Sequence, residues 1–156
     1  MNVHRVQMTT LIVVLVAGLV LSAAASASSA SSKQRVAIVH NGSSFVLTPL
    51  TSGAVKGDTG IASFCCWSDR HTIRNGEAVE INDPKMTLTG KLGTLVARNQ
   101  IGWVDISDGW SLFTGTWTVV RGTGQYAGLA GGGRGAGIQW PNGKERAHFE
   151  GFLATK

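Results

Sequence analysis

The sequence contains few residues that cross-link or interrupt a fold: its 156 residues include three prolines and two cysteines. The cysteines, Cys65 and Cys66, are adjacent, so neither has a distant partner for an ordinary disulfide. Neighbouring Cα atoms lie about 3.8 Å apart, whereas a relaxed disulfide spans roughly 4.4–6.8 Å. Two packed thiols, a strained vicinal disulfide and an intermolecular bond all remain open interpretations.

Patterns typical of metal, nucleotide and nucleic-acid sites are also missing. Histidine and cysteine do not occur at metal-ligand spacing, so we expect no metal and no cofactor. The net charge is +5 but the basic residues are scattered singly, which argues against a nucleic-acid partner. Residues 122–127 match the G-x-G-x-x-A form of a dinucleotide fingerprint, yet more glycines follow where that motif requires a helix. We interpret the stretch as a glycine-rich bend with Tyr126 as a packing anchor.

No segment after the N-terminal region has the 3.6-residue period of an amphipathic helix. Glycine is abundant instead, with 21 residues, and Asn-Gly or Asp-Gly pairs at 41–42, 75–76, 108–109 and 142–143 favour two-residue hairpin turns. We expect strands over residues 36–40, 43–47, 60–67, 86–94, 95–106, 110–121, 134–140 and 146–153. The predicted fold class is all-β, a single antiparallel barrel of roughly eight strands, whose interior is either just filled or holds one small ligand.

The N-terminal residues predict an export signal. Arg5 precedes an apolar run over residues 11–21, and small residues follow at 23–25 and 25–27 in the A-x-A form that signal peptidases cleave. The apolar run is shorter than the roughly 20 residues that span a membrane, although an uncleaved anchor is the alternative. We therefore predict a signal-peptide helix over 1–27, a flexible linker over 28–34 and the barrel domain over 35–156.

The hairpin around Asp108-Gly109 yields the first candidate site. A two-residue turn there pairs Val104 with Phe113 and Gln100 with Trp117, and places these side chains and Arg98 inside the barrel. The opposite, outer face then carries Ile101, Trp103, Thr114, Thr116 and Thr118. A three-residue loop would exchange the two faces. With the packing anchor of the glycine-rich bend added, the candidate ligand-binding residues are Arg98, Gln100, Phe113, Trp117 and Tyr126.

Histidine–carboxylate pairs on two further hairpins are candidates for acid–base catalysis. Asp69 and His71 share one face, and Glu80 lies opposite His71 across the turn at 75–76. On the last hairpin, His148 and Glu150 lie opposite alternating glycines, which leave space for a guest. Each group is equally typical of a solvated surface, and the last hairpin is equally typical of a bent barrel corner with His148 and Glu150 outside.

The run over residues 116–131, Thr-Trp-Thr-Val-Val-Arg-Gly-Thr-Gly-Gln-Tyr-Ala-Gly-Leu-Ala-Gly, resembles a recurring motif of the dirigent and allene oxide cyclase-like barrels. Residues 63–153 also resemble small exported bacterial proteins without an assigned activity. The resemblance implies an eight-stranded antiparallel barrel with an interior open at one end. Members of the group cyclise or couple small apolar substrates without a cofactor, and some form trimers. Their acidic catalytic positions match no residue of this chain, so the activity does not carry over.

Three functions remain open. The first is an exported barrel, secreted or held in the periplasm or envelope, that binds a small apolar molecule beside Phe113, Trp117 and Trp140. The second is a cofactor-free isomerase or cyclase that uses His71 or His148 with Glu80 or Glu150. The third is a structural or interaction protein of the envelope whose interior its own side chains fill. We expect a monomer or small homo-oligomer with no membrane span after signal removal.

Overall fold

A computed structural model of the chain describes residues 33–74 and 77–156. The signal peptide predicted over 1–27, most of the linker and the turn at 75–76 lie outside these residues. The described residues form ten strands and a single short 3-10 helix: β1 Gln34–Asn41, β2 Ser44–Pro49, β3 Asp58–Cys65, β4 Asp69–Arg74, β5 Glu77–Asn82, β6 Lys85–Gly90, β7 Thr94–Ser107, β8 Trp110–Gly122, η1 Gly124–Tyr126, β9 Leu129–Gln139 and β10 Glu145–Thr155.

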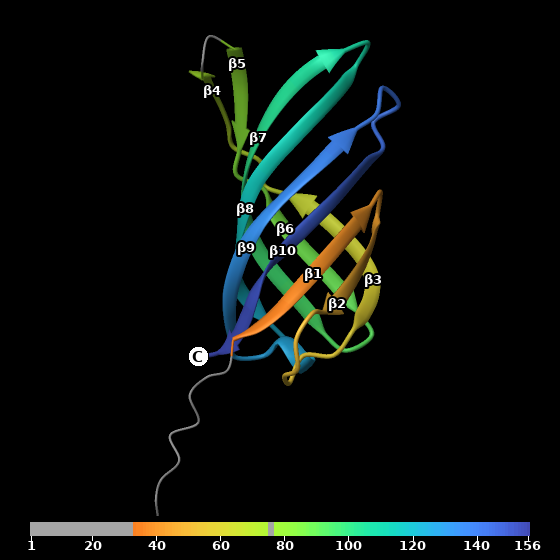
Figure 1. The fold of residues 1–156 in the computed structure, drawn as a ribbon, viewed down its shortest axis with the longest axis vertical. Helices are drawn as coiled ribbons and strands as arrows, with labels where there is room; N and C mark the ends of the chain where they lie inside the picture. The colour runs from red at the N-terminus through yellow and green to blue at the C-terminus, as the bar shows by residue number, and fades with distance from the viewer. Residues whose placement is uncertain (1–32, 75–76) are drawn as a thin grey trace, which may run out of the picture.

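Eight of these strands close into an antiparallel barrel, which confirms the predicted fold class (Figure 1). The ring runs β7-β6-β3-β2-β1-β10-β9-β8, and pairing of β8 with β7 closes it. Closure removes the free edges at which an open sheet would pair with another chain. Strands β4 and β5 form an additional hairpin, which is joined to the upper part of β7 through pairs such as Ile81↔Gly102. This hairpin extends the wall at one end, which we call the mouth.

The turn predicted at Asp108-Gly109 is confirmed, because Ser107 pairs with Trp110 across it. Both turn residues have positive φ, 50° and 78°, as a type I′ turn requires. The register predicted beyond the turn is nevertheless wrong. A β-bulge between Asp105 and Ser107 inserts one unpaired residue into β7, so Trp103 rather than Val104 pairs with Phe113.

Because side chains alternate along a strand, this single residue exchanges the faces of β7. Ile101 and Trp103, predicted outside, pack against the core. Arg98 and Gln100, predicted inside, are exposed, and Asn99 takes the inward position opposite Trp117. The β8 side of the prediction is confirmed: buried side chains on one face alternate with exposed threonines on the other, at Thr114, Thr116 and Thr118.

Two other predicted turns are displaced. Strand β1 pairs with β2 as Asn41↔Ser44, so the first turn is 42–43 rather than 41–42. Between β9 and β10 the loop spans 140–144, where the Trp140 N–H donates to the Lys144 carbonyl at 2.8 Å. A two-residue turn at 142–143 would pair Pro141 across the ladder, and proline has no N–H to donate.

The wider loop sets the position of the alternating glycines of β9. Gly135 and Gly137 face inward and are paired with Phe149 and Ala147. A Cβ at Gly135 would collide with the Phe149 ring, and a Cβ at Gly137 with the Phe113 ring. The glycines therefore make room for aromatic side chains of the core, and His148 and Glu150 lie outside, as the surface interpretation predicts.

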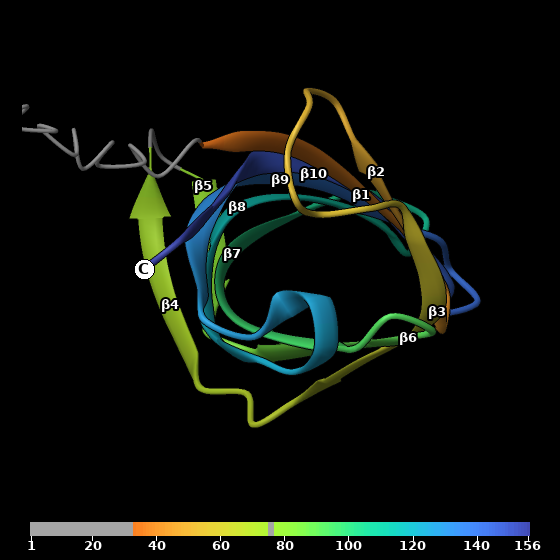
Figure 2. The same cartoon turned by 90° about the horizontal axis from the view of Figure 1, so that it is seen from below.

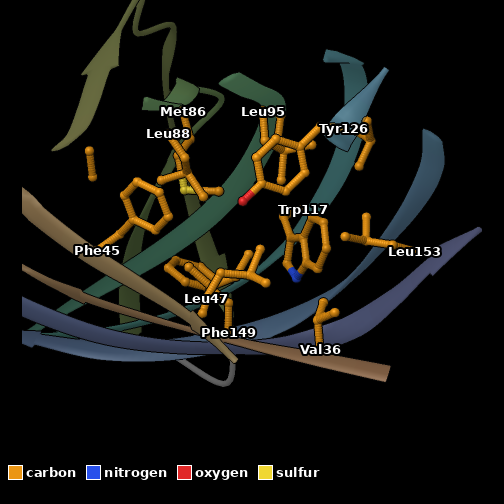
Figure 3. Close-up of a cluster of buried hydrophobic side chains, with 14 of the residues drawn as sticks. Val36, Phe45, Leu47, Met86, Leu88, Leu95, Trp117, Tyr126, Phe149 and Leu153 are labelled. Carbon is orange, nitrogen blue, oxygen red and sulfur yellow. The ribbon is translucent and has the colours of Figure 1, made fainter. Parts of the chain in front are cut away.

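The barrel interior is a packed hydrophobic core (Figure 3). Its largest side chains with less than 2 % of their surface exposed include Trp117, Tyr126, Phe149 and Met86. Phe113 and Trp117 point inward as predicted, but both are buried among other core side chains rather than around a wide hollow. Burial on this scale supplies most of the stability of a small barrel.

Buried side chains close the end of the barrel opposite the mouth, where η1 and two loops lie (Figure 2). Residues 86–94 were predicted as one strand, but β6 ends at Gly90 and the chain bends over residues 91–93. Buried Asp58 causes this bend, because its carboxylate accepts hydrogen bonds from the Lys91 and Leu92 N–H groups at 3.0 and 3.3 Å. The Tyr126 hydroxyl donates to the same carboxylate at 3.0 Å, which confirms Tyr126 as the anchor of the glycine-rich bend.

The first residue of β1 also fastens this end. Gln34, predicted as the last residue of the linker, is 3 % exposed. Its side chain donates to the Thr51 and Val55 carbonyls and accepts from the Val55 N–H.

Among the described residues, no helix has the length and hydropathy of a membrane span.

Candidate functional site

Two adjoining cavities occupy the mouth and share Trp67 and Trp103. The inner chamber, of about 10 Å³, is lined by His40, Phe64, Trp67, Ile101, Trp103, Phe113, Glu145, Ala147 and Phe149. The outer chamber, an open cleft of about 410 Å³, is lined by Trp67, Asp69, Glu80, Asn82, Trp103, Asp105, Ser111 and Gln139. The inner chamber has room for about one water molecule, whereas the outer one is within the range of small-molecule sites.

His40 is the buried polar group of the inner chamber. It ends an inward-facing series with Val36 and Ile38 on β1, so the two-residue strand period buries it, and its side chain is 1 % exposed. Its Nε2 has no hydrogen-bond partner among the described residues. Burial lowers the pKa of His40, and a hydrogen bond between its ring and the Gly42 backbone opposes this effect. The imidazole is therefore held mainly in its neutral form at neutral pH.

Glu145 lies beside His40 at the start of β10, with its Oε1 3.9 Å from the His40 Nδ1. Burial raises the pKa of Glu145, so the protein favours the uncharged carboxyl as well as the uncharged imidazole. The pair is thus one ionisable acid and one ionisable base in an apolar chamber. Sequence reasoning missed both residues, although the phase of His40 with Val36 and Ile38 was a usable signal.

Aromatic rings form the wall between the two chambers. The Trp103 and Phe113 ring centroids are 4.4 Å apart, and the Phe64 and Trp67 rings stack at 6.4 Å. The edge of His40 packs against Phe64 at 4.9 Å. The Trp103 Nε1–H is buried without a hydrogen-bond partner in the described part of the chain. A buried indole N–H usually finds an acceptor, so this group and the His40 Nε2 mark two unmet polar positions.

The outer chamber is acidic. A single amide nitrogen, Asn82 Nδ2, donates to Asp69 Oδ1 at 2.6 Å and to Glu80 Oε1 at 2.8 Å. The third carboxylate, Asp105, accepts from the Ser111 hydroxyl at 2.6 Å. None of the side chains that line this chamber is basic. Within the described residues, no three His, Cys, Asp or Glu side chains converge closely enough to hold a metal ion.

The structure separates the five predicted ligand-binding residues. Phe113 lines the inner chamber, Trp117 lies in the core with its Nε1 3.3 Å from the Glu150 carbonyl, and Tyr126 is at the closed end. Arg98 and Gln100 line a different cavity, an open polar cleft of about 560 Å³ on the outer surface with Cys66, Ser68, Asp83, Asn99, Thr116 and Thr118. No single site contains all five.

Of the predicted histidine–carboxylate pairs, His71, His148 and Glu150 are exposed, whereas Glu80 lines the outer chamber. His71 is paired with Glu80 across β4 and β5 as predicted, but His71 is exposed and Glu80 accepts from Asn82. His148 Nε2 lies 3.1 Å from Glu150 Oε1, with both side chains about half exposed. The side-chain hydrogen bonds to His148 and Arg35 lower the pKa of Glu150. This is the arrangement of a surface ion pair.

The adjacent cysteines lie where β3 ends: Cys65 is its last residue and Cys66 follows it. Both are free and exposed, and Cys66 has a left-handed backbone with φ of 63°. A hydrogen bond with the Cys66 thiol raises the pKa of Cys65. The left-handed residue turns the chain immediately before Trp67, so it helps to direct that ring to the chambers.

Comparison with known proteins identifies no relative: no family model matches the chain, and no match is found among the curated proteins or the solved structures.

Proposed function

We propose that this protein is an exported β-barrel that binds a small, mostly apolar molecule at its mouth, over Trp67 and Trp103. The observation that carries the proposal is the outer chamber of about 410 Å³, which rests on an aromatic wall and on two buried polar atoms without partners. The two indole rings supply the apolar contact surface of the chamber, and its polar side chains supply the groups that orient a ligand. The packed core leaves the mouth, rather than the middle of the barrel, as the ligand position.

Export is the cellular part of the proposal. It is supported by Arg5, the apolar run over residues 11–21 and the small residues that follow. If it is right, intact-mass measurement of the protein recovered from the culture medium or envelope will give a chain beginning at residue 26 or 28. A full-length chain recovered from the cytoplasm would contradict it.

Kinship with the dirigent and allene oxide cyclase-like barrels is supported by the closed eight-stranded ring and the resemblance of residues 116–131.

Ligand binding is tested with the protein from its own culture medium. Native mass spectrometry should detect a co-purifying small molecule, and the emptied protein should bind the apolar dye N-phenyl-1-naphthylamine with a one-to-one rise in fluorescence. Trp67→Ala should weaken dye binding at least about tenfold, because it removes one of the two indole rings that line the outer chamber. Trp110→Ala is the matched control, since the Trp110 ring contacts Trp140 and lines neither chamber.

The opposite result would favour a structural protein. If native mass spectra show only empty protein and the dye fails to bind, the mouth is not a ligand site. Equal dye affinity of wild type and Trp67→Ala would place any binding elsewhere and would also overturn the proposal.

A second function, cofactor-free proton transfer as in an isomerase or cyclase, is favoured by the His40–Glu145 pair. The neutral imidazole can accept a proton, and burial, which raises the pKa of Glu145, shifts its carboxyl towards the form that donates one. Exchange of the α-protons of phenylacetone in deuterated water, followed by NMR, tests this chemistry. Glu145→Gln and His40→Leu should slow the exchange to the rate of buffer, whereas His148→Leu, a change on the outer surface, should leave it unchanged. Equal rates for all four proteins would remove the catalytic function.

A further inference from the structure

The charge at the mouth differs from that of the chain as a whole. The protein carries a net charge of +5, yet the outer chamber gathers three carboxylates and no basic side chain. Elsewhere Asp83 and Glu150 are paired with arginines, at 2.9 Å from Arg70 and 3.2 Å from Arg35. No described residue forms an ion pair with the three carboxylates of the outer chamber.

Hydrogen bonds position these carboxylates but occupy only one oxygen of each. Asn82, which is 4 % exposed, fixes one oxygen of Asp69 and one of Glu80. Ser111 fixes one oxygen of Asp105. Each carboxylate keeps its second oxygen, for which the described part of the chain provides no partner. A cation that enters this chamber is attracted by all three carboxylates, because all three line it.

The walls of the chamber distinguish the kind of cation. Trp67, with 49 % of its surface exposed, and Trp103 present indole rings to the same space as the carboxylates. Indole is the aromatic group that attracts organic cations most strongly. A bare metal ion would need converging ligands, and no such set of ligands exists in residues 33–74 and 77–156. A chamber of about 410 Å³ suits a larger, less hydrated ion.

The floor of the mouth provides an independent sign that a ligand is missing. The side chain of His40 is 1 % exposed, lines the inner chamber and leaves its Nε2 without a partner. Trp103, whose buried Nε1–H is also unpartnered, lines both chambers. Unpaired buried polar atoms are costly, so such positions are typically filled by a polar ligand atom or a bound water. The inner chamber has room for one such atom.

Resting on the proposed function, we infer that the ligand is a small organic cation, an ammonium compound whose charged head lies among Asp69, Glu80 and Asp105 against the two indoles. A hydroxyl or water then occupies the inner chamber, where it donates to His40 Nε2 and accepts from the Trp103 N–H. The carboxylates supply charge and the rings supply cation–π attraction. The site therefore discriminates against neutral molecules of the same shape.

Choline and 3,3-dimethylbutan-1-ol are the matched probes, because they have the same shape and differ by the replacement of the ammonium nitrogen with carbon. Both are titrated into the mature exported protein in phosphate buffer, since Tris is itself an organic ammonium. Calorimetry gives the affinity, and the indole N–H signals of Trp67 and Trp103 in NMR spectra give the position. We expect choline to bind at least about tenfold more tightly than the alcohol, and its affinity to fall with added salt.

Isosteric variants test the carboxylates. Asp69→Asn, Glu80→Gln and Asp105→Asn should each weaken choline binding at least about threefold and leave the affinity for the alcohol unchanged. Asp83→Asn is the matched control, because Asp83 is already paired with Arg70 outside the mouth, and it should change neither affinity. Choline binding that survives all three mouth variants would overturn the inference.

The outcomes for the two proposals are separate. If the alcohol or the apolar dye binds as tightly as choline, or the dye binds and choline does not, the organic-cation inference is wrong and ligand binding at the mouth stands. If neither probe nor the dye shifts the Trp67 and Trp103 signals, both proposals fail.

Discussion

At the closed end of the barrel the buried polar groups bind one another, whereas near the mouth several of them bind nothing in the described residues. Asp58 accepts four hydrogen bonds, and both polar atoms of the Gln34 side chain are used. By contrast His40 and Trp103 each leave one polar atom unpartnered at the mouth, and the Asn99 amide, which lines the separate outer cleft, leaves two. Satisfied networks stabilise a fold, while unmet groups are commonly retained for a ligand, so the difference separates a structural end from a functional end.

Among the variants that test this comparison, Asp58→Ala should cause the largest loss of stability. The change leaves three backbone N–H groups and the Tyr126 hydroxyl without their acceptor, and we expect it to lower the free energy of unfolding by about 3 kcal/mol. Burial is the main reason why the pKa of Tyr126 is raised, so the phenol stays protonated and continues to require an acceptor. Urea unfolding followed by tryptophan fluorescence measures the loss.

Asp69→Ala is the control for that experiment at the mouth. Asp69 is exposed and accepts one described hydrogen bond, from an amide that Glu80 also binds. We expect its loss to cost under about 1 kcal/mol. Equal losses for Asp58→Ala and Asp69→Ala would remove the distinction between the two ends.

A smaller difference is expected between two glycines with similar backbones. Gly124 and Gly143 have φ of 58° and 75°, a left-handed conformation that an L-residue adopts at a cost. A Cβ at Gly124 would collide with the Leu92 carbonyl, whereas a Cβ at Gly143 meets nothing within 4 Å. We expect Gly124→Ala to cost about 2 kcal/mol and Gly143→Ala about 1 kcal/mol in urea unfolding. A larger loss at Gly143 would contradict the tight packing of the closed end.

The barrel was predictable because its signals are local and repeated. The left-handed residues Asp108 and Gly109 form the turn that their types predict, and alternating threonines on β8 mark an outer face. The faces of β7 were not predictable, because the bulge beside Ser107 adds a residue without a sequence signature of its own. Since the period of a strand is two, that residue moves Arg98 to the outside.

The mouth was harder to predict because its chemistry comes from distant segments. His40 and Glu145 are separated by more than a hundred residues and meet only through pairing of β1 with β10. Asp58 follows a glycine in what looks like an ordinary turn, and only closure of the barrel brings Tyr126 to it. Sequence spacing reports neighbours along a hairpin, whereas these contacts depend on the closed ring.

The mouth itself is tested by His40→Leu. Replacing an imidazole that has an unmet nitrogen with a similar apolar side chain should change the unfolding free energy by less than about 1 kcal/mol at pH 7.5. The pKa of His40 is lowered from 6.5 by burial, so below pH 6.5 the unfolded chain binds a proton that the native chain resists. Wild type should therefore lose stability relative to the variant as the pH falls below 6.5.

Glu145 does not reverse the expected pH dependence of the stability difference between wild type and His40→Leu. Its pKa is raised by burial, so its unfavourable contribution is present at high pH and is relieved as the pH falls. Both proteins retain Glu145, and the difference between them isolates the imidazole to first order. Urea unfolding from pH 5 to 8 measures this difference in unfolding free energy. If wild type instead gains stability relative to His40→Leu as the pH falls, the pKa of His40 is raised rather than lowered on folding.

The smallest change in stability is expected at Cys66, a residue other than glycine that has a left-handed backbone. Cys66→Gly should relieve the strain of φ at 63° and raise the unfolding free energy by about 0.5 kcal/mol, because part of the gain is offset by the greater entropy of glycine in the unfolded chain. Cys65→Gly, in the extended end of β3, has the entropy cost without the relief and should lower stability by about 0.5 kcal/mol. Both are measured by urea unfolding with a reductant present. A loss in Cys66→Gly equal to that in Cys65→Gly would show that the turn before Trp67 stores no strain, and the orientation of that ring would then depend on Phe64 alone.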